Sequence, residues 1–384
     1  MKRETILTAV VTLVSLLIAF GAGFLTHQII SPPELETPIL SQVKQIIENH
    51  AYYPLPDEKT LEYGMIHGMV GALDDPYASF TEPVEHELET NTFEGHFGGI
   101  GCTLTLDEEG RIMLYPSAEG PAREVGIRDG DILVGVDDSV ITIDTDIHEA
   151  VALVRGPVGD KVKITIQRPP EMEEISFEIK RAEIPLPSVS FRPLDQYPQI
   201  GLIDINIIAA STADEIVAAV EELQAQGVEY FILDLQGNGG GLLDAGIEIS
   251  RLFLEDGEII YEQFKGEDPD VFKVKQKGTL ADIPIAVLID QNSASASEII
   301  AGAIQVHDRG PLIGIPSYGK NTVQLVFTLE DNSSIHVTSA VWWLPGQDAD
   351  VDFQLIPDIP APEDGMSYDA ILQLAVEYFE NSGQ

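Results

Sequence analysis

The N-terminal part of the chain carries its longest hydrophobic segment. An apolar run without charged residues extends from Ile6 to about Thr26, after the basic residues Lys2 and Arg3. Roughly 20 apolar residues are enough to span a bilayer as a helix, and basic residues before the run place the N-terminus inside the cell. We therefore expect a signal anchor, or transmembrane helix, in residues 1–30 and an extracytoplasmic, membrane-anchored location in the cell envelope for the rest of the chain.

A cleaved signal peptide is the alternative interpretation of this segment. The small residues Ala19, Gly21 and Gly23 leave a cleavage site open. A cleaved signal has a shorter apolar region than the one found here, so the pattern favours an anchor. Cleavage would make the protein secreted.

Residues 31–96 are expected to form a linker and an N-terminal helical region. A proline-rich connector at residues 32–38 is expected to be extended. Apolar residues then recur at helical spacing. They are Ile39, Val43, Ile46 and Ile47, followed after a break by Leu61, Met65, Ile66, Met69 and Val70. The segment 74–80 predicts a turn, and the polar, mostly acidic residues 81–95 predict a helix and then a linker.

The pattern changes to short β-type runs between Phe97 and about Ala182. The runs are IGCTLTL, RIMLYPS, DILVGVDD, KVKITIQRP and ISFEIKRA. Gly-Asp turns separate them, together with one short amphipathic helix from Thr145 to Arg155. Residues 97–182 therefore form a compact β-rich module of the size of a small domain.

Strands and helices alternate in residues 183–384. Apolar strands are expected at IGLIDINII, YFILDL and IPIAVLID, with helices at 212–226, at about 242–254 and after the third strand. Such alternation implies crossover connections and a largely parallel sheet. VQLVFTL and SIHVTSAVWWLP flank turn residues and predict a hairpin, and a last helix is expected from about Ser367 to Tyr378. The fold class is multidomain α/β.

The charge balance narrows the possible partners. The chain has 64 acidic and 21 basic residues, a formal net charge of −43. Nucleic acid needs Lys and Arg to neutralise its phosphates, and an anionic membrane surface repels such a chain, so the acidity indicates a solvated surface. The single cysteine, Cys102, excludes an intramolecular disulfide and a cysteine metal cluster. It lies in an apolar stretch and is expected to be a small buried hydrophobe.

The first candidate for catalysis is the serine-rich segment SASASE at residues 293–298, between a buried strand and a helix. Backbone N–H groups and the helix dipole at such a position favour negative charge, as a nucleophile that leads to an oxyanion requires. Serine is also a preferred residue at a helix N-terminus. Taken alone, the segment is better explained by capping.

Two further segments carry candidate chemistry. Lys320, in YGKNTVQ, lies between two β-runs, where burial would lower the pKa of its ammonium group and allow it to act as a base; alone it could be a surface turn lysine. The loop DLQGNGGGLL at residues 234–243 can present N–H groups to an anion. It lacks the lysine of a phosphate-binding loop and the spacing of a dinucleotide fingerprint, so no nucleotide is expected. A tight turn is its other interpretation.

Together, these three segments resemble the carboxy-terminal processing, or tail-specific, serine peptidases of peptidase family S41. The resemblance implies that Ser295, three residues before Glu298, is the nucleophile. It implies that Lys320, which follows 25 residues later, is the general base and that Gln324 orients it. The implied activity is that of an endopeptidase acting through a Ser–Lys dyad and an acyl-enzyme.

The resemblance also implies an oxyanion hole and a substrate-recognition module. The N–H groups of Ala296 and Gly240 would hold the oxyanion. Residues 97–182 resemble the PDZ domain of this family, with 120–138 as its most recognisable stretch. Its loop for a substrate C-terminal carboxylate would be Phe97, Gly98, Gly99, Ile100 and Gly101. Residues 183–384 would be the catalytic domain, a mixed α/β core of the crotonase/ClpP-like type.

The implied partners are protein or peptide substrates with exposed C-termini, the membrane through the anchor, and a second copy of the chain in a possible homo-oligomer. No cofactor or metal is expected, and no pair of histidines has metal-ligand spacing in the sequence. Gln236 and Gly239 depart from the arginine and proline that are usual in the family's oxyanion loop. These departures keep open a second hypothesis, a membrane-tethered PDZ adaptor with an inactive peptidase core.

Overall fold

The computed structural model describes residues 37–349, 353–362 and 367–382, and the chain divides into two compact units, Met1–Met65 and Ile66–Gln384. The expected anchor at residues 1–30 lies outside the described residues. Among the helices that are described, none combines the length and the apolar character needed to cross a membrane.

The first unit contains helix α2 (Pro38–His50) and the beginning of α3 (Glu58–Val70). Proline at the first position suits the start of α2. An ion pair joins Lys44 to Glu58 at 2.9 Å. The helical spacing predicted both helices, but the apolar residues of α2 are exposed, Ile39 at 70%.

The β-rich module is built on an antiparallel six-stranded sheet with the order β3-β4-β5-β7-β8, in which β6 pairs with β5. The strands are β3 (Cys102–Leu106), β4 (Ile112–Pro116), β5 (Asp131–Val136), β6 (Ser139–Val140), β7 (Lys161–Arg168) and β8 (Glu173–Lys180). Helices α5 (Pro121–Glu124) and α6 (Ile147–Val154) complete the module. Its own core includes Ile100, Leu114, Ile164 and Ile179. Because β3 lies at the edge of the sheet, one side of this strand has no partner strand within it.

A two-stranded antiparallel ribbon lies where the chain enters and leaves this module. Strand β2 (His96–Gly99) pairs with β9 (Ala182–Pro185), and Phe97 lies opposite Ile184. Helix α4 (Pro83–Glu94) ends at Gly95 and leads directly into β2, so a strand takes the place of the linker that the sequence predicted.

A second six-stranded sheet has the order β10-β11-β12-β15-β16-β19. Its strands are β10 (Val189–Leu194), β11 (Tyr197–Ile205), β12 (Tyr230–Asp234), β15 (Ile285–Ile289), β16 (Leu312–Gly314) and β19 (Ile359–Pro360). β10 pairs with β11 antiparallel, and all the other pairs are parallel. The predicted, largely parallel sheet is therefore present, with an antiparallel strand at one edge.

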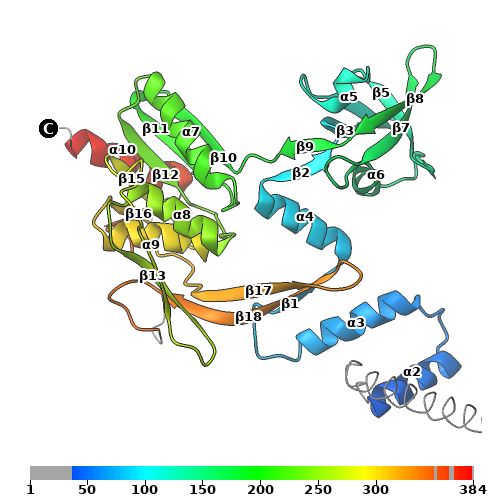
Figure 1. The fold of residues 1–384 in the computed structure, drawn as a ribbon, viewed down its shortest axis with the longest axis horizontal. Helices are drawn as coiled ribbons and strands as arrows, with labels where there is room; N and C mark the ends of the chain where they lie inside the picture. The colour runs from blue at the N-terminus through cyan, green and yellow to red at the C-terminus, as the bar shows by residue number, and fades with distance from the viewer. Residues whose placement is uncertain (1–36, 350–352, 363–366, 383–384) are drawn as a thin grey trace, which may run out of the picture. The chain divides into compact units, whose positions relative to one another are not determined.

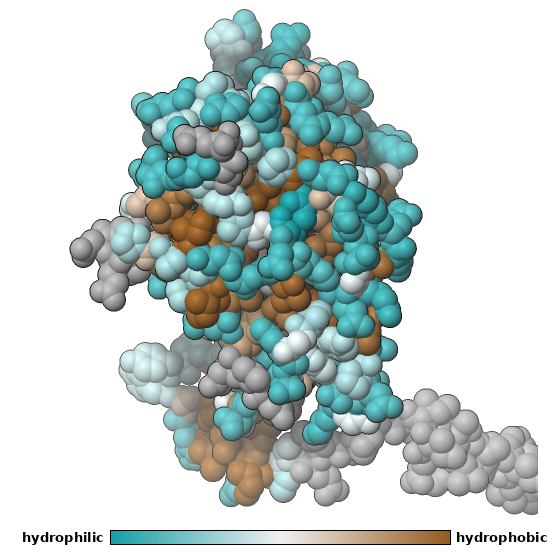
Figure 2. Space-filling view, turned by 90° about the vertical axis from the view of Figure 1, so that its left-hand side faces the viewer, coloured by the Kyte–Doolittle hydropathy of each residue, from teal (hydrophilic) through white to brown (hydrophobic). Residues whose placement is uncertain are grey.

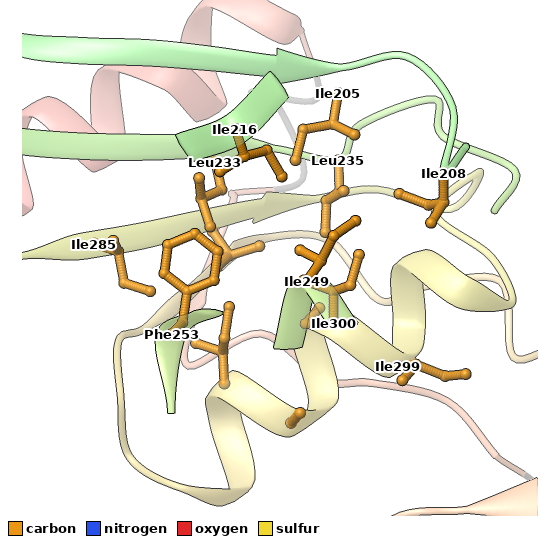
Figure 3. Packing of buried hydrophobic residues seen from close by; sticks show 14 of the residues in the cluster. Ile205, Ile208, Ile216, Leu233, Leu235, Ile249, Phe253, Ile285, Ile299 and Ile300 are labelled. Atoms are coloured by element: carbon orange, nitrogen blue, oxygen red, sulfur yellow. The ribbon is translucent and has the colours of Figure 1, made fainter. Parts of the chain in front are cut away.

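Helices cover both faces of this sheet (Figure 1). α7 (Thr212–Ala225), α8 (Leu243–Phe253) and α9 (Ala296–Val306) pack on one face, where Ile205, Leu233 and Ile300 belong to one buried cluster (Figure 3). On the other face, α10 (Tyr368–Ser382) packs against Ile232 and Leu288. A parallel sheet that is buried on both faces requires apolar strands without alternation, which explains the continuous runs in the sequence.

A third, antiparallel sheet joins segments from distant parts of the chain. It contains β1 (Ser79–Thr81), β13 (Glu258–Phe264), β14 (Asp270–Lys273), β17 (Thr322–Thr328) and β18 (Ser334–Trp343). β17 and β18 form the predicted hairpin, and β1 pairs with β18. The segment 74–80, predicted as a turn, therefore ends in a strand. Local sequence gave no sign of β1 because its partner lies some 250 residues away.

The surface agrees with the acidic composition. On the face drawn in Figure 2, hydrophilic residues predominate, and hydrophobic residues form smaller patches between them. With a net charge of −43, such a surface repels other polyanions.

Candidate active site

Ser295 lies at the sharp turn between β15 and α9, as the N-cap residue of the helix. Its backbone angles are φ 56° and ψ −120°. These angles belong to the first central position of a type II′ turn, which glycine normally occupies. A non-glycine residue in this region is strained, and such strain is concentrated at functional sites. An ordinary N-cap serine has β-region angles instead, so capping alone does not explain Ser295.

The side chain of Glu298 connects the Ser295 turn with the Lys320 segment. Its Oε2 accepts hydrogen bonds from the backbone N of Ser295 at 2.8 Å and from the backbone N of Lys320 at 2.9 Å. Its Oε1 accepts from Ser317 Oγ at 2.6 Å and from the backbone N of Gly319 at 2.7 Å. Glu298 is fully buried, and burial raises the pKa of its carboxyl group against the opposing effect of these donors. One carboxylate therefore holds the two predicted dyad residues close together.

Lys320 follows Gly319, whose backbone has φ +92° and lies so close to Phe353 O that a Cβ would come within 2.3 Å of it. The Lys320 Nζ lies over the ring of Tyr77, 4.7 Å from its centroid. Burial lowers the pKa of the Lys320 ammonium group, although Asp75 and Glu298 act in the opposite direction. A partly buried lysine with a lowered pKa is a candidate general base.

Gln324 lies on β17 and contacts a polar network beside the lysine. Its Nε2 donates to Thr322 Oγ1 at 3.0 Å and to Thr338 Oγ1 at 3.1 Å. Thr338 Oγ1 in turn donates to Asp75 Oδ1 at 3.0 Å. Gln324 therefore reaches the surroundings of Lys320 through Thr338 and Asp75. Its direct role on the lysine stays a prediction.

The glycine loop after β12 packs directly against the Ser295 turn. A Cβ on Gly240, which has φ +101°, would lie 2.7 Å from Ala294 O, 2.9 Å from Ser295 Cβ and 3.0 Å from Ala296 N. Only glycine allows so close an approach. The predicted oxyanion residues Gly240 and Ala296 therefore lie beside the candidate nucleophile.

Asn238 fixes the conformation of this loop. It is buried, and its Oδ1 accepts from Gly240 N at 2.8 Å and from Ser297 Oγ at 2.7 Å. Its Nδ2 donates to Ile205 O at 2.5 Å. The Gly240 N–H is thus occupied by Asn238, and it must leave this acceptor before it can bind an oxyanion. For Ala296, at the first position of α9, the described residues include no acceptor for the N–H group.

Comparison with known proteins places this geometry in a family. The model of Peptidase family S41 matches residues 199–361, and a PDZ domain model matches residues 114–168. The carboxy-terminal processing protease CtpA of Bacillus subtilis (strain 168) is 32% identical over 351 residues, which cover 89% of this chain and 74% of that protein. The chain belongs to peptidase family S41.

Two further similarities span most of the chain. The carboxy-terminal-processing protease of Bartonella bacilliformis is 32% identical over 331 residues, covering 84% of this chain and 75% of that protein. The solved structure of the photosystem II D1 C-terminal processing protease is 24% identical, with a TM-score of 0.47, and the match covers 86% of this chain and 90% of that chain. As a member of family S41, the chain is a serine-type peptidase.

The PDZ domain of this S41 peptidase has a groove between β3 and α6. The cavity has a volume of about 200 Å³ and is lined by Phe97, Gly99, Ile100, Gly101, Cys102, Thr103, Leu104, Val151, Val154 and Arg155. The predicted carboxylate loop thus contributes four of its five residues, and Gly98 lies within β2. Ile100 is buried, and Gly101 has φ +65° at the turn into β3.

Cys102 lines this groove and is half-buried rather than fully buried. Burial raises the pKa of its thiol to about 12. The thiol therefore stays protonated at neutral pH and behaves as the small apolar group that the sequence predicted.

Several residues of the site carried no signal in the sequence. Asp75 and Tyr77 come from the segment before β1, and Thr338 comes from β18. In the sequence, Asn238 was one residue of the glycine loop and had no predicted role. Glu298 only helped to locate Ser295 within the serine motif. A buried polar side chain with several partners is recognisable only when those partners are known.

Proposed function

We propose that this S41 peptidase is an endopeptidase of the C-terminal processing type that uses Ser295 and Lys320 as a catalytic dyad. The observation that carries the proposal is the hydrogen bonding of both backbone nitrogens to one oxygen of Glu298. The strained backbone of Ser295 and the lowered pKa of Lys320 support it independently.

The mechanism follows from the roles of these groups. The neutral Lys320 amine takes the proton from Ser295 Oγ as this oxygen attacks the scissile carbonyl carbon. The resulting oxyanion is stabilised by the N–H of Ala296 and by that of Gly240 once Asn238 has released it. Lys320 then gives the proton to the leaving amine, and the C–N bond breaks. Water, deprotonated by Lys320, then attacks the acyl carbonyl carbon. The bond from this carbon to Ser295 Oγ breaks, Lys320 returns the proton to Oγ, and the carboxylate product leaves.

Substrate recognition is assigned to the PDZ domain. Because β3 is an edge strand, a peptide C-terminus can add to it as an extra strand, with its side chain in the groove beside α6. The N–H groups around Gly99–Gly101 would bind the terminal carboxylate. Substrates are therefore proteins with an exposed, unfolded C-terminus.

The cellular location of the peptidase is part of the same proposal. The charge-free apolar run at residues 6–26 after two basic residues supports an anchor, with the peptidase outside the cytoplasm. Substrates would then be proteins of the cell envelope. A fusion of the N-terminal 36 residues to a reporter that is active only outside the cytoplasm tests this location, and an inactive reporter would refute it.

The dyad is tested by cleavage of an unfolded protein with the full chain and its variants. Ser295→Ala and Lys320→Ala are each expected to lower kcat/KM by about 1,000-fold or more, because each removes one member of a unit that acts together. Lys275→Ala, at an exposed lysine, is the matched control and should leave cleavage unchanged.

The cleavage assay is combined with binding of a peptide that has a free or an amidated C-terminus. Equal cleavage by the wild-type chain and both dyad variants would refute the mechanism. Absence of cleavage in all of them, with retained binding of a peptide that has a free C-terminus, would favour the inactive adaptor. Loss of binding on C-terminal amidation of the peptide is the expected signature of carboxylate recognition, and equal binding would refute the role given to the PDZ loop.

A further inference from the structure

A second cluster of functional side chains lies away from the dyad, where α4 meets the β17–β18 hairpin. His86 and Glu89 are three residues apart on α4 and therefore share one face of the helix. His336 lies on β18, next to Val326 of β17. One ligand atom from each of these three residues lies within 4.8 Å of the other two. In Figure 1, α4 lies beside the end of the hairpin.

The hydrogen bonding of His86 is incomplete. One ring nitrogen, Nε2, is 3.2 Å from Thr328 Oγ1. The other, Nδ1, is buried and has no hydrogen-bond partner among the described residues. A buried polar atom without a partner is costly and calls for an explanation. When Nε2 donates to the Thr328 hydroxyl, Nδ1 carries a lone pair, which is the arrangement that a metal-ligating imidazole has.

The other two residues complete a donor set. His336 Nε2 is 3.2 Å from Glu89 Oε2, and the side chains are only 12% and 33% exposed. Ser334 Oγ lies 3.3 Å from the same His336 nitrogen. Two imidazoles and one carboxylate are ligands that zinc and related transition metals prefer, whereas Mg²⁺ and Ca²⁺ select oxygen ligands.

We propose that His86 Nδ1, Glu89 and His336 Nε2 bind one divalent transition-metal ion, with Zn²⁺ as the best match. Metal–ligand bonds of about 2.0–2.2 Å in a tetrahedral site place ligand atoms roughly 3.3–3.6 Å apart. One ligand atom of each residue lies within 4.8 Å of the other two, so binding of one ion requires these side chains to move closer together. Three protein ligands leave the fourth position for water.

The ion would link two functional parts of the peptidase. α4 leads directly into β2 at the entrance of the PDZ domain, and β17 and β18 carry Gln324 and Thr338, which are linked by hydrogen bonds to Asp75, a carboxylate that acts on Lys320. A bound ion would fasten α4 to this hairpin. Hydrogen exchange of the amides in residues 83–94 is therefore expected to slow when the ion binds.

Binding is tested on the full chain after removal of metals with a chelator. Zn²⁺ is titrated against a chromophoric competitor in excess Ca²⁺, which occupies surface carboxylates. One Zn²⁺ per chain is expected, with nitrogen and oxygen ligands at about 2.0–2.2 Å by X-ray absorption. His86→Gln, Glu89→Gln and His336→Gln should each weaken the affinity at least about tenfold, in line with the cost of disturbing a metal site. His148→Gln, at an exposed histidine on α6, is the matched control.

The outcomes do not depend on peptidase activity. Absence of stoichiometric binding to the wild-type chain would overturn the proposal. Equal affinity of the wild-type chain and the three ligand variants would also overturn it, because the ion would then bind elsewhere. Circular dichroism of each variant verifies folding. Weakened Zn²⁺ binding in two folded ligand variants is sufficient to support the proposed site.

Discussion

Glu298 is the residue on which the geometry of the site depends most. Its two oxygens accept four hydrogen bonds, from Ser295, Ser317, Gly319 and Lys320, in a fully buried position. The sequence identified this residue as a motif marker, because a glutamate three residues into a helix is also an ordinary capping residue. Its role as the link between Ser295 and Lys320 depends on its hydrogen bonds to Gly319 and Lys320, which lie more than 20 residues further along the chain.

We predict that Glu298→Gln both destabilises the peptidase and lowers its activity. Glutamine replaces one acceptor oxygen with an NH₂ group, which faces N–H or O–H donors instead of accepting from them. Loss of hydrogen bonds to a buried charge costs about 2 kcal/mol, and urea unfolding should show a decrease of this size in the free energy of unfolding. Activity should fall at least about tenfold. Glu267→Gln, at an exposed glutamate, is the control, and identical behaviour of the two variants would contradict the assigned role.

The lowered pKa of Lys320 predicts how the activity depends on pH. Burial lowers the pKa of its ammonium group from the ordinary value of 10.5. In the proposed mechanism the neutral amine is the active form, so kcat/KM should be low at acidic pH and rise as pH increases through the lowered pKa. A pH–rate profile with its midpoint at or above 10.5 would argue against a buried base. Lys320→Arg keeps the charge but cannot lose its proton and should be inactive throughout the range.

At the scale of elements, the site is formed where three connections converge. The turn from β15 into α9 carries Ser295, the segment between β16 and β17 carries Lys320, and the loop from β12 into α8 carries Gly240. The carboxyl ends of adjacent parallel strands lie at the same edge of a sheet, where α/β proteins place their sites. The order β12-β15-β16 makes these three connections neighbours.

Two neighbouring glycines of the β12–α8 loop should respond differently to substitution. Gly240→Ala places a Cβ within 2.7 Å of Ala294 O at φ +101°, and it should lower activity at least about 100-fold, since small displacements of a site have large effects. A Cβ on Gly239 meets no atom within 4 Å, so Gly239→Ala should keep most of the activity. Cleavage kinetics of the two variants provide the comparison. Similar losses of activity in both variants would show that the close packing of Gly240 on Ser295 does not account for the effect.

At the scale of the whole molecule, the acidic surface is expected to reduce stability through self-repulsion. The net charge of −43 is screened by salt, because the Debye length falls from about 30 Å at 0.01 M to about 3 Å at 1 M. We predict that the Tm rises as NaCl increases over this range. Differential scanning fluorimetry measures the shift, with sucrose at equal osmolality as an uncharged control. An unchanged Tm in NaCl would show that repulsion between the acidic groups does not lower the stability of the protein.

Local patterning determined which elements form. Apolar runs around Ile232 and Val287 predicted buried strands, and the spacing in 212–225 predicted α7, because side-chain period is a property of a few consecutive residues. The order and spacing of Ser295, Lys320 and the glycine loop indicated the family. Weak strands such as β1 and β14 were missed, since they exist only through pairing with a partner.

The sequence by itself thus determined the parallel core, the β-rich module and the hairpin, and it supplied Ser295 and Lys320 as the candidate dyad, all from short-range periodicity or motif spacing. Only the tertiary structure decided that Glu298 joins the two, that Asn238 occupies the Gly240 N–H, and that His86 and Glu89 meet His336. The physical reason is the same in each case. Burial, hydrogen bonding and metal ligation depend on atoms that are close in space, and the chain brings these atoms together from positions that no local pattern relates.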